Sequence, residues 1–127
     1  MDVSIIIVNY NTCDLLKQCI QSIITNTREV VYEIIVIDND SHDESCQMLK
    51  NDFPTVKLIR SNINLGFGKA NNLGIKQASG KYLFFLNSDT ILCNNAIKNF
   101  FEFSISYTDK LGATGTILKD NNGMLYP

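Results

Sequence analysis

The sequence has no long apolar run, no strong excess of charge of either sign and no CxxC pair. Its longest apolar stretches, at 3–8, 34–37 and 82–86, fall far below the roughly 20 residues needed to span a bilayer. The first residues also lack the basic region and small-residue cleavage site of a secretory signal. Eleven basic residues stand against 13 acidic ones, so nothing global attracts nucleic acid or an anionic membrane. We therefore expect no transmembrane segment and no nucleic-acid partner.

Several common site chemistries are also missing. The four cysteines have no histidine at zinc-ligand spacing, so we expect reduced thiols, as in a cytosolic protein. No GxxxxGK[ST] stretch is present, which excludes a phosphate-binding P-loop. Gly66–Asn71 begins like a GxGxxG dinucleotide fingerprint, but Asn71 replaces the third glycine and the motif follows the third expected strand. The single histidine, His42, lies in an acidic loop and is more typical of a surface residue than of a catalytic triad.

What the sequence does contain is enough apolar residues, 45%, for the core of one domain. Continuous β-branched runs alternate along the chain with segments of helical periodicity. Strands are expected at 3–8, 32–37, 56–60, 81–86 and 112–118, and helices at 14–26, 43–51, 67–78 and 94–107. A turn at 120–123, leading to 124–126, is expected after the last strand. This order predicts an α/β domain, a doubly wound and mostly parallel sheet with helices on both faces, over residues 1–127.

Local signals predict where the helices begin and end. Asn11 or Thr12 is the expected N-cap of the first helix. Ser41 and Glu44 have capping-box spacing before the second helix. Gly80 is expected to close the third helix from the C′ position.

Polar clusters follow the first, second and fourth expected strands. In open α/β sheets, ligands bind outside the carboxyl ends of the strands, so these clusters predict a ligand site at one edge. The clusters are Asn9-Tyr10-Asn11, Asp38-Asn39-Asp40 and Asn87-Ser88-Asp89.

These segments, in their order along the chain, resemble family 2 glycosyltransferases of GT-A fold. The resembling stretches are Val3–Asn11, Ile35–Ser45, Asn64–Ile75, Tyr82–Thr90 and Leu111–Leu125. Together they cover nearly the whole chain, and the combination is more specific than any single motif. The chain looks closest to the rhamnosyltransferase-like branch. Asn39 stands where other members have a second aspartate, and Asn87 opens an Asn-x-Asp in place of Asp-x-Asp.

The resemblance implies a nucleotide-diphosphate-sugar donor, UDP- or dTDP-linked. It also implies transfer of a hexosyl or deoxyhexosyl unit, with inversion, to a glycan or lipid-linked acceptor. Tyr10 would pack its ring against the nucleobase or ribose. Asp38 or Asn39 would hydrogen-bond to the base or ribose, and which of the two faces the base stays open. Asn9 and Asn11 belong to the same donor-binding segments.

Asp89 is expected to have the largest role, as the metal ligand. A divalent cation, Mg²⁺ or Mn²⁺, neutralises the charge that a diphosphate leaving group gathers. Such a cation prefers oxygen ligands, and Asp89 supplies one carboxylate. Asn87 would reach the ribose or a metal-bound water, with Ser88 between them, and Gly66 would let the backbone pass close to the donor. The alternative for Asp89 is the N-cap of a following turn.

No residue can be assigned as the general base that inverting transfer needs. In the family this carboxylate and most acceptor contacts come from a later segment. The chain is therefore expected to be the truncated, donor-binding N-terminal half of a longer enzyme, without transfer activity alone. A face left uncovered would favour a homo-oligomer. The resemblance also implies a cytoplasmic protein, with peripheral attachment at the inner face of the membrane as an open alternative.

Two other functions stay open at this point. A non-catalytic module that binds a nucleotide sugar would account for the missing base. A phosphoacceptor domain of flavodoxin-like topology would also carry acidic residues at strand ends. That domain expects a lysine after the last strand, however, and Lys119 is only loosely placed for it.

Overall fold

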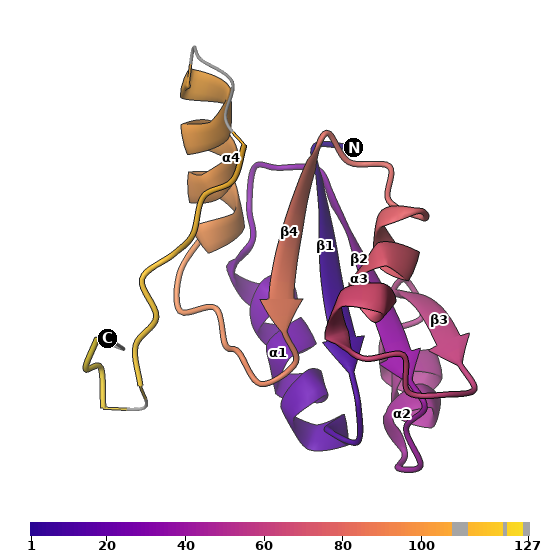
Figure 1. Cartoon of the computed structure of the whole chain (residues 1–127). Coiled ribbons are helices and arrows are strands. Elements are labelled where there is room, and N and C mark those ends of the chain that lie inside the picture. The colour runs from indigo at the N-terminus through magenta and orange to yellow at the C-terminus, as the bar shows by residue number, and fades with distance from the viewer. Residues whose placement is uncertain (108–111, 121, 126–127) are drawn as a thin grey trace.

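The computed structural model describes residues 1–107, 112–120 and 122–125. Strands and helices alternate along the chain as β1 (Val3–Asn9), α1 (Cys13–Asn26), β2 (Tyr32–Asn39), α2 (Ser45–Asp52), β3 (Lys57–Ser61), α3 (Phe67–Ile75), β4 (Tyr82–Asn87) and α4 (Ala96–Ser106). The strands form one parallel sheet in the order β3-β2-β1-β4 (Figure 1). The predicted α/β class and parallel sheet are confirmed.

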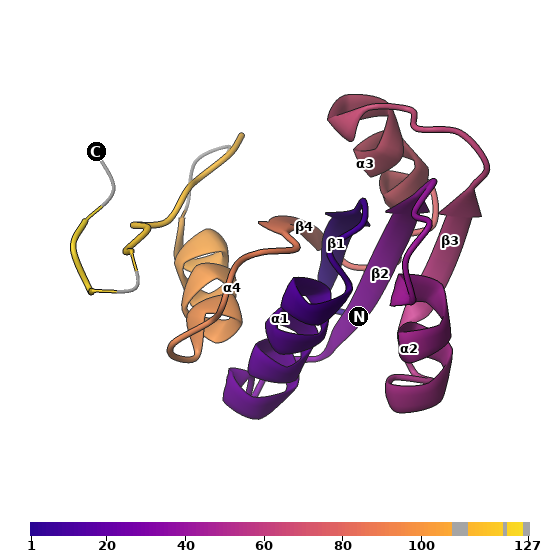
Figure 2. The ribbon, with the colours of Figure 1, turned by 90° about the horizontal axis from the view of Figure 1, so that it is seen from below.

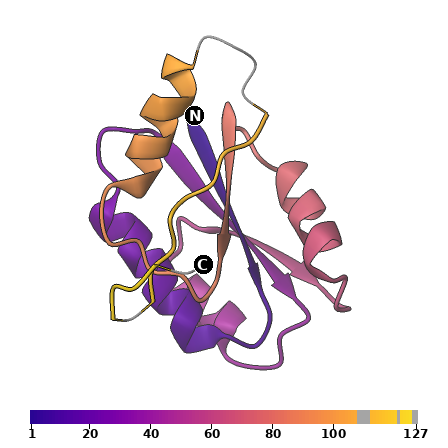
Figure 3. The same cartoon turned by 60° about the vertical axis from the view of Figure 1, so that its left-hand side comes forward.

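Helices cover both faces of the sheet, which explains why its inner strands are apolar without alternation. Along β1, Ile5 and Ile7 face α1 and α2 whereas Ile6 faces α3, and all three are fully buried. Ile97 of α4 joins the core on the α1 side. Figure 2 shows α1 and α2 on one side of the sheet and α3 on the other, and Figure 3 shows α4 on the side of α1. Within the described residues, no helix combines the length and hydropathy that crossing a membrane requires.

The prediction of a fifth strand at 112–118 is wrong. These residues form no strand, and the apolar side chains of Ile117 and Leu118 are 75% and 55% exposed. The segment has only three β-branched residues and carries glycine at 112 and 115, and among the described residues it finds neither strand partners nor a face to bury. The expected turn after it is present in part: Lys119 and Leu125 form an isolated antiparallel bridge, and Gly123 N donates to Asp120 O (3.0 Å). Asn121 and Tyr126 of this expected turn lie outside the described residues.

Two expected helix ends are also wrong. The helix α3 ends at Ile75, before the expected 78, and Gly80 does not occupy its C′ position. Gly80 instead lies against β1, where a Cβ atom would stand 2.4 Å from Ser4 N. No capping box forms before α2, which begins at Ser45 with no side-chain cap from Glu44. The hydroxyl of Ser41 accepts hydrogen bonds from Asn9 Nδ2 at the end of β1 and from Asn11 N in the following loop, and it is therefore not free to cap the helix.

Glu33 joins three segments at the amino ends of the strands. Its Oε1 accepts hydrogen bonds from Ser4 Oγ (2.6 Å) and from both N and Oγ of Ser79 (2.7 Å each). Partial burial by itself raises the pKa of Glu33. The hydrogen bonds from Ser4 and Ser79 and the positive charge of Lys57 outweigh this effect and hold the pKa below its usual value.

These contacts predict that acid weakens the fold. A carboxyl whose pKa is lower in the folded state stabilises the protein fully above its unfolded pKa, about 4.3 for glutamate. We therefore expect the free energy of unfolding to fall as the pH drops from about 4.3 through the lower folded pKa. Glu33→Gln should reduce this slope in urea denaturation measured across the acid range. An unchanged slope would assign the acid sensitivity to other carboxylates.

Candidate functional site

The carboxyl ends of β1, β2 and β4 lie next to one another at one edge of the sheet. Asn9 pairs in register with Asp38 of β2, and Val8 pairs with Asn87 of β4. The three polar clusters that follow these strands are therefore brought together as the sequence predicts. Their side chains differ in whether they reach solvent.

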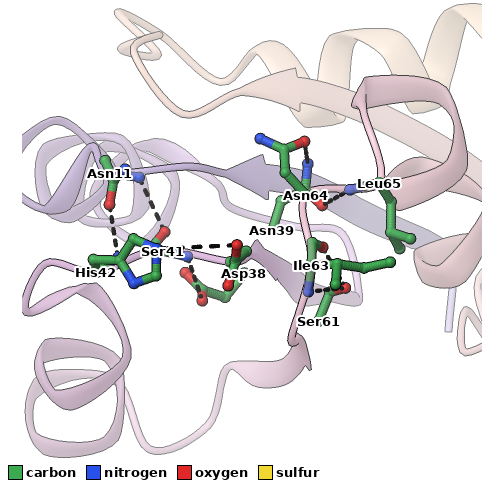
Figure 4. A network of polar contacts seen from close by, with 10 residues as sticks. Asn11, Asp38, Asn39, Ser41, His42, Ser61, Ile63, Asn64 and Leu65 are labelled. Carbon is green, nitrogen blue, oxygen red and sulfur yellow. Dashed lines mark hydrogen bonds and ion pairs between the residues drawn. The ribbon is translucent and has the colours of Figure 1, made fainter.

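Asn9 and Asp38 are buried beneath this edge, at 0% and 1% exposure. Asn9 Nδ2 donates to Asp38 Oδ1 (3.1 Å) and to Ser41 Oγ (3.0 Å). Ser41 N in turn donates to Asp38 Oδ2 (3.2 Å), as Figure 4 shows. Both side chains therefore bond to each other and to Ser41, and they hold the strand ends and the loop after β2 together beneath the surface.

Asn39, also buried, holds the loop that leads into α3. Its Nδ2 donates to Asn64 Oδ1 (2.9 Å), and its Oδ1 accepts from Leu65 N (2.9 Å) (Figure 4). Gly66 N donates to the same Asn64 oxygen (2.9 Å), and Gly66 adopts a φ of +75°, which favours glycine. An amide at position 39 serves here because it donates and accepts at once.

Tyr10 and Asn11 reach the surface at the end of β1. Tyr10 is 48% exposed, so part of its ring is available to a flat ligand. Asn11 has a left-handed φ of 53°, which asparagine tolerates better than most residues. Its N donates to Ser41 Oγ (3.0 Å) and its Oδ1 accepts from His42 N (2.7 Å), which joins this loop to the loop after β2 (Figure 4).

Asn87 is exposed at the end of β4 and Asp89 is exposed in the turn that follows, with Ser88 half-buried between them. Among the described residues, no hydrogen bond or ion pair engages the Asp89 carboxylate, and the next helix, α4, begins only at Ala96. Asp89 therefore does not cap that helix. Beneath the turn, burial raises the pKa of the Cys19 thiol to about 12, and the negative charge of Asp89 adds to the effect.

A hollow of about 490 Å³ opens beside the N-terminus of α1. Asp14, Asp43 and Glu44 line it together with Asn11–Cys13. Burial raises the pKa of Asp43, but hydrogen bonds from Ser45 and from Cys13 N outweigh this and lower it. Three carboxylates would repel a diphosphate, so this hollow does not suit an anionic ligand without a cation.

The sequence predictions missed three residues that organise the edge. Thr12 and Ser41 were expected only as helix caps, and Asn64 was not assigned a role. Each makes its contact across 25 or more residues of sequence: Thr12 with Ser88, Ser41 with Asn9, and Asn64 with Asn39. Their position in turns beside the polar clusters is the signal that could have indicated them.

Comparison with known proteins decides the family. A family model described as "Glycosyl transferase family 2" matches residues 4–122. The chain belongs to this family. The resemblance noted in the sequence is confirmed at this level, and so is its GT-A-like fold.

Two relatives of this family 2 chain carry poly(ribitol-phosphate) in their names. A poly(ribitol-phosphate) beta-glucosyltransferase of Bacillus spizizenii is 35% identical over 109 residues, which cover 82% of this chain and 17% of the relative. TarP of Staphylococcus aureus, a poly(ribitol-phosphate) beta-N-acetylglucosaminyltransferase, is 30% identical over 105 residues, covering 80% of this chain and 32% of TarP. The chain thus spans a third or less of these two relatives. They do not confirm the rhamnosyltransferase-like branch.

Crystal structures of S. aureus TarS 1–349 share the fold. The complex with UDP has a TM-score of 0.75 and 25% identity, and the match covers 84% of this chain and 32% of that one. The complex with UDP-GlcNAc has a TM-score of 0.73 and 26% identity over the same shares.

Asp89 and Asn87 could bind a cation at this edge only if a bound ligand supplied further oxygen atoms to it. The described part of the chain contains no group of three or more histidine, cysteine, aspartate or glutamate side chains that could hold a metal ion. Asp89 offers one free carboxylate and Asn87 one amide oxygen. Mg²⁺ in nucleotide sites needs only one or two protein carboxylates besides phosphate oxygens and water. The edge therefore suits a cation that arrives with a diphosphate.

Proposed function

We propose that this family 2 domain, residues 1–127, is the donor-binding half of a glycosyltransferase. Its nucleotide-sugar site would be the shared edge of β1, β2 and β4. The proposal rests on the pairing of β1 with β4, which sets the exposed ring of Tyr10 and the free carboxylate of Asp89 on adjacent strand ends. A ring face suits a nucleobase, and a carboxylate suits a cation on a diphosphate. The UDP and UDP-GlcNAc complexes of TarS support a UDP-linked donor, although a dTDP-linked one shares the same chemistry.

The proposed role of each residue depends on whether its side chain is exposed to solvent. Tyr10 and Asn11 would contact the base and ribose directly, since both are exposed. Direct contact of the base with Asp38 or Asn39 remains a prediction. Asn39 would have to exchange its hydrogen bond to Asn64 for one to the ligand. Gly66, in the loop that Asn39 holds, would pass close to the donor.

Asp89 would hold Mg²⁺ or Mn²⁺, and Asn87 would reach the ribose or a metal-bound water. When bound, the cation would offset the negative charge that gathers on the diphosphate as the sugar leaves. Ser88 would support this turn from its half-buried position. No described residue is assigned as the general base.

The finer parts of the proposal rest on the resemblance alone. They are inversion, a rhamnosyltransferase-like donor sugar, a glycan or lipid-linked acceptor, and a cytoplasmic location, with peripheral attachment at the inner face of the membrane as the alternative. Self-association is supported by the exposed apolar side chains of Leu83 and Phe85 on β4, at 39% and 47%. A non-catalytic module is not favoured, because the named relatives are transferases.

A nucleotide with metal should stabilise the fold. A ligand that binds only the folded state at 100 times its Kd adds about 2.7 kcal/mol to the free energy of unfolding. For a domain of this size we expect Tm to rise by roughly 8 °C with saturating UDP and Mn²⁺ in a thermal melt.

Mn²⁺ alone and UDP with a chelator are the controls, and each should give a smaller rise. No shift with millimolar UDP and Mn²⁺ would contradict the nucleotide site. An equal shift with inorganic phosphate and Mn²⁺ would reduce it to an anion site.

A further inference from the structure

A continuous run of hydrogen bonds lies beneath the proposed site and crosses it from β2 to β4. Asp38 accepts from Asn9 Nδ2 (3.1 Å), Asn9 Oδ1 lies 2.7 Å from Thr12 Oγ1, and Thr12 Oγ1 lies 2.9 Å from Ser88 Oγ. The amide oxygen of Asn9 can only accept, so Thr12 gives its single proton to Asn9 and accepts one from Ser88. The run therefore ends in the turn that carries Asp89.

Thr12 does not have the role that its position at the start of α1 suggests. A threonine there is expected to cap the helix with its hydroxyl, yet the structure has no side-chain cap hydrogen bond at this N-cap. Asp43 Oδ2 accepts from Cys13 N (3.0 Å) in its place. The Thr12 hydroxyl is therefore free for the link to Ser88.

Thr12 also connects the loop after β1 to the turn after β4, which form two sides of the proposed site. Among the described residues, the bond between Thr12 and Ser88 is the one side-chain hydrogen bond between the loop after β1 and the turn after β4. One loop carries Tyr10, on the proposed nucleoside side, and the turn carries Asp89, on the proposed diphosphate side. Removing the hydroxyl would leave the fully buried Asn9 without a donor for its oxygen and Ser88 without an acceptor.

We propose that Thr12 is a positioning residue for the nucleotide-sugar donor. Its hydroxyl, bonded to Asn9 and Ser88, fixes the Asn87–Asp89 turn relative to the loop that carries Tyr10. This inference rests on the proposed function and deepens it. The Thr12 hydroxyl would keep the nucleoside-binding loop and the diphosphate-binding turn at a fixed distance from each other.

The test is the Kd of UDP, measured by calorimetry with Mn²⁺ and with a chelator, for the wild type, Thr12→Val and Thr12→Ser. Valine keeps the shape and removes the hydroxyl, whereas serine keeps the hydroxyl. We expect Thr12→Val to weaken UDP binding with Mn²⁺ by about tenfold, as loss of a residue behind a metal ligand does. The Kd with chelator should change less than about twofold, since the hydroxyl acts through Asp89. Thr12→Ser should restore the wild-type ratio of the two Kd values.

Two further variants separate positioning from general weakening. Ser88→Ala should reproduce the Thr12→Val effect, and the double variant should lose little more, because both changes break one link. Thr25→Val is the matched control, since Thr25 is exposed on α1 and its hydroxyl, within the part of the chain that the structure describes, bonds only to Gln21. It should leave both Kd values unchanged.

Three other results would contradict the inference or the proposed function. Equal losses with and without Mn²⁺, in step with a lower free energy of unfolding, would make Thr12 a purely structural residue and overturn the inference. UDP binding that Mn²⁺ does not strengthen in the wild type would overturn the inference and the metal role of Asp89, while leaving the nucleotide site standing. No UDP binding by the wild type would overturn the proposed function itself.

Discussion

Replacing Asp89 by asparagine should remove nearly all of the strengthening that Mn²⁺ gives to UDP binding. We expect the Kd of UDP with Mn²⁺ to rise by about 100-fold, while the Kd with a chelator stays near the wild-type value. Changes to residues behind a metal ligand already cost 10- to 100-fold, so loss of the ligand itself should cost no less. Calorimetric titration with UDP in the two conditions measures both values.

The size of this effect follows from how few ligands the site offers. Asp89 is exposed, has no hydrogen-bond or ion-pair partner among the described residues, and stands beside a neutral Asn87. A site with two carboxylates would retain some affinity after losing one. Here the remaining ligands would be an amide and the diphosphate, and Mg²⁺ and Mn²⁺ bind neutral amides more weakly than carboxylates.

Asp52→Asn is the matched control, because it removes the same charge. Asp52 is the last residue of α2 and pairs with Lys17 on the surface. Its replacement should leave both Kd values within about twofold, since exposed ion pairs contribute little. If Asp89→Asn and Asp52→Asn weakened UDP equally, net charge would explain the loss. If Asp89→Asn kept the Mn²⁺ effect, another residue would hold the metal.

The sheet could be predicted from sequence because its signal is local. Residues 3–8 and 34–37 are continuous and β-branched, and that pattern arises where a strand is buried on both faces. The order of strands and helices then leaves few topologies. Residues 112–118 have a weaker local signal, because glycine at 112 and 115 interrupts the β-branched residues Thr114, Thr116 and Ile117, and these residues form no strand.

The sequence indicates the surface residues of the candidate site but not the residues that support them. Tyr10 and Asp89 stand directly after strands, where ligands of parallel sheets bind, so their positions alone indicate them. Thr12 carries two competing signals: local spacing makes it a helix cap, and only the folded sheet brings it within 2.9 Å of Ser88. Asn39 is similar, since its two bonds go to a loop 25 and 26 residues away.

The role of Gly80 also could not be predicted from local sequence. Its position after a helical segment indicates a helix end, whereas in the structure its backbone packs closely against β1. A Cβ atom at this position would stand 2.4 Å from Ser4 N and 2.6 Å from the carbonyl carbon of Val3, both backbone atoms of β1, an inner strand of the sheet. Gly80 N also donates to Ser4 Oγ (2.8 Å). Backbone inside a parallel sheet cannot move aside without breaking ladder hydrogen bonds, so an added methyl group must displace the start of β4.

Gly80→Ala should therefore lower the free energy of unfolding by about 3 kcal/mol, at the upper end of the usual cost of overpacking. In a thermal melt this corresponds to a fall in Tm of roughly 10 °C. Gly112→Ala is the matched control, because a Cβ atom there meets nothing within 4 Å, and it should change the free energy by less than about 1 kcal/mol. Urea denaturation of the three proteins measures both differences. A loss below about 1 kcal/mol for Gly80→Ala would mean that β4 can shift along β1, and the turn carrying Asp89 would then not be held by the sheet alone.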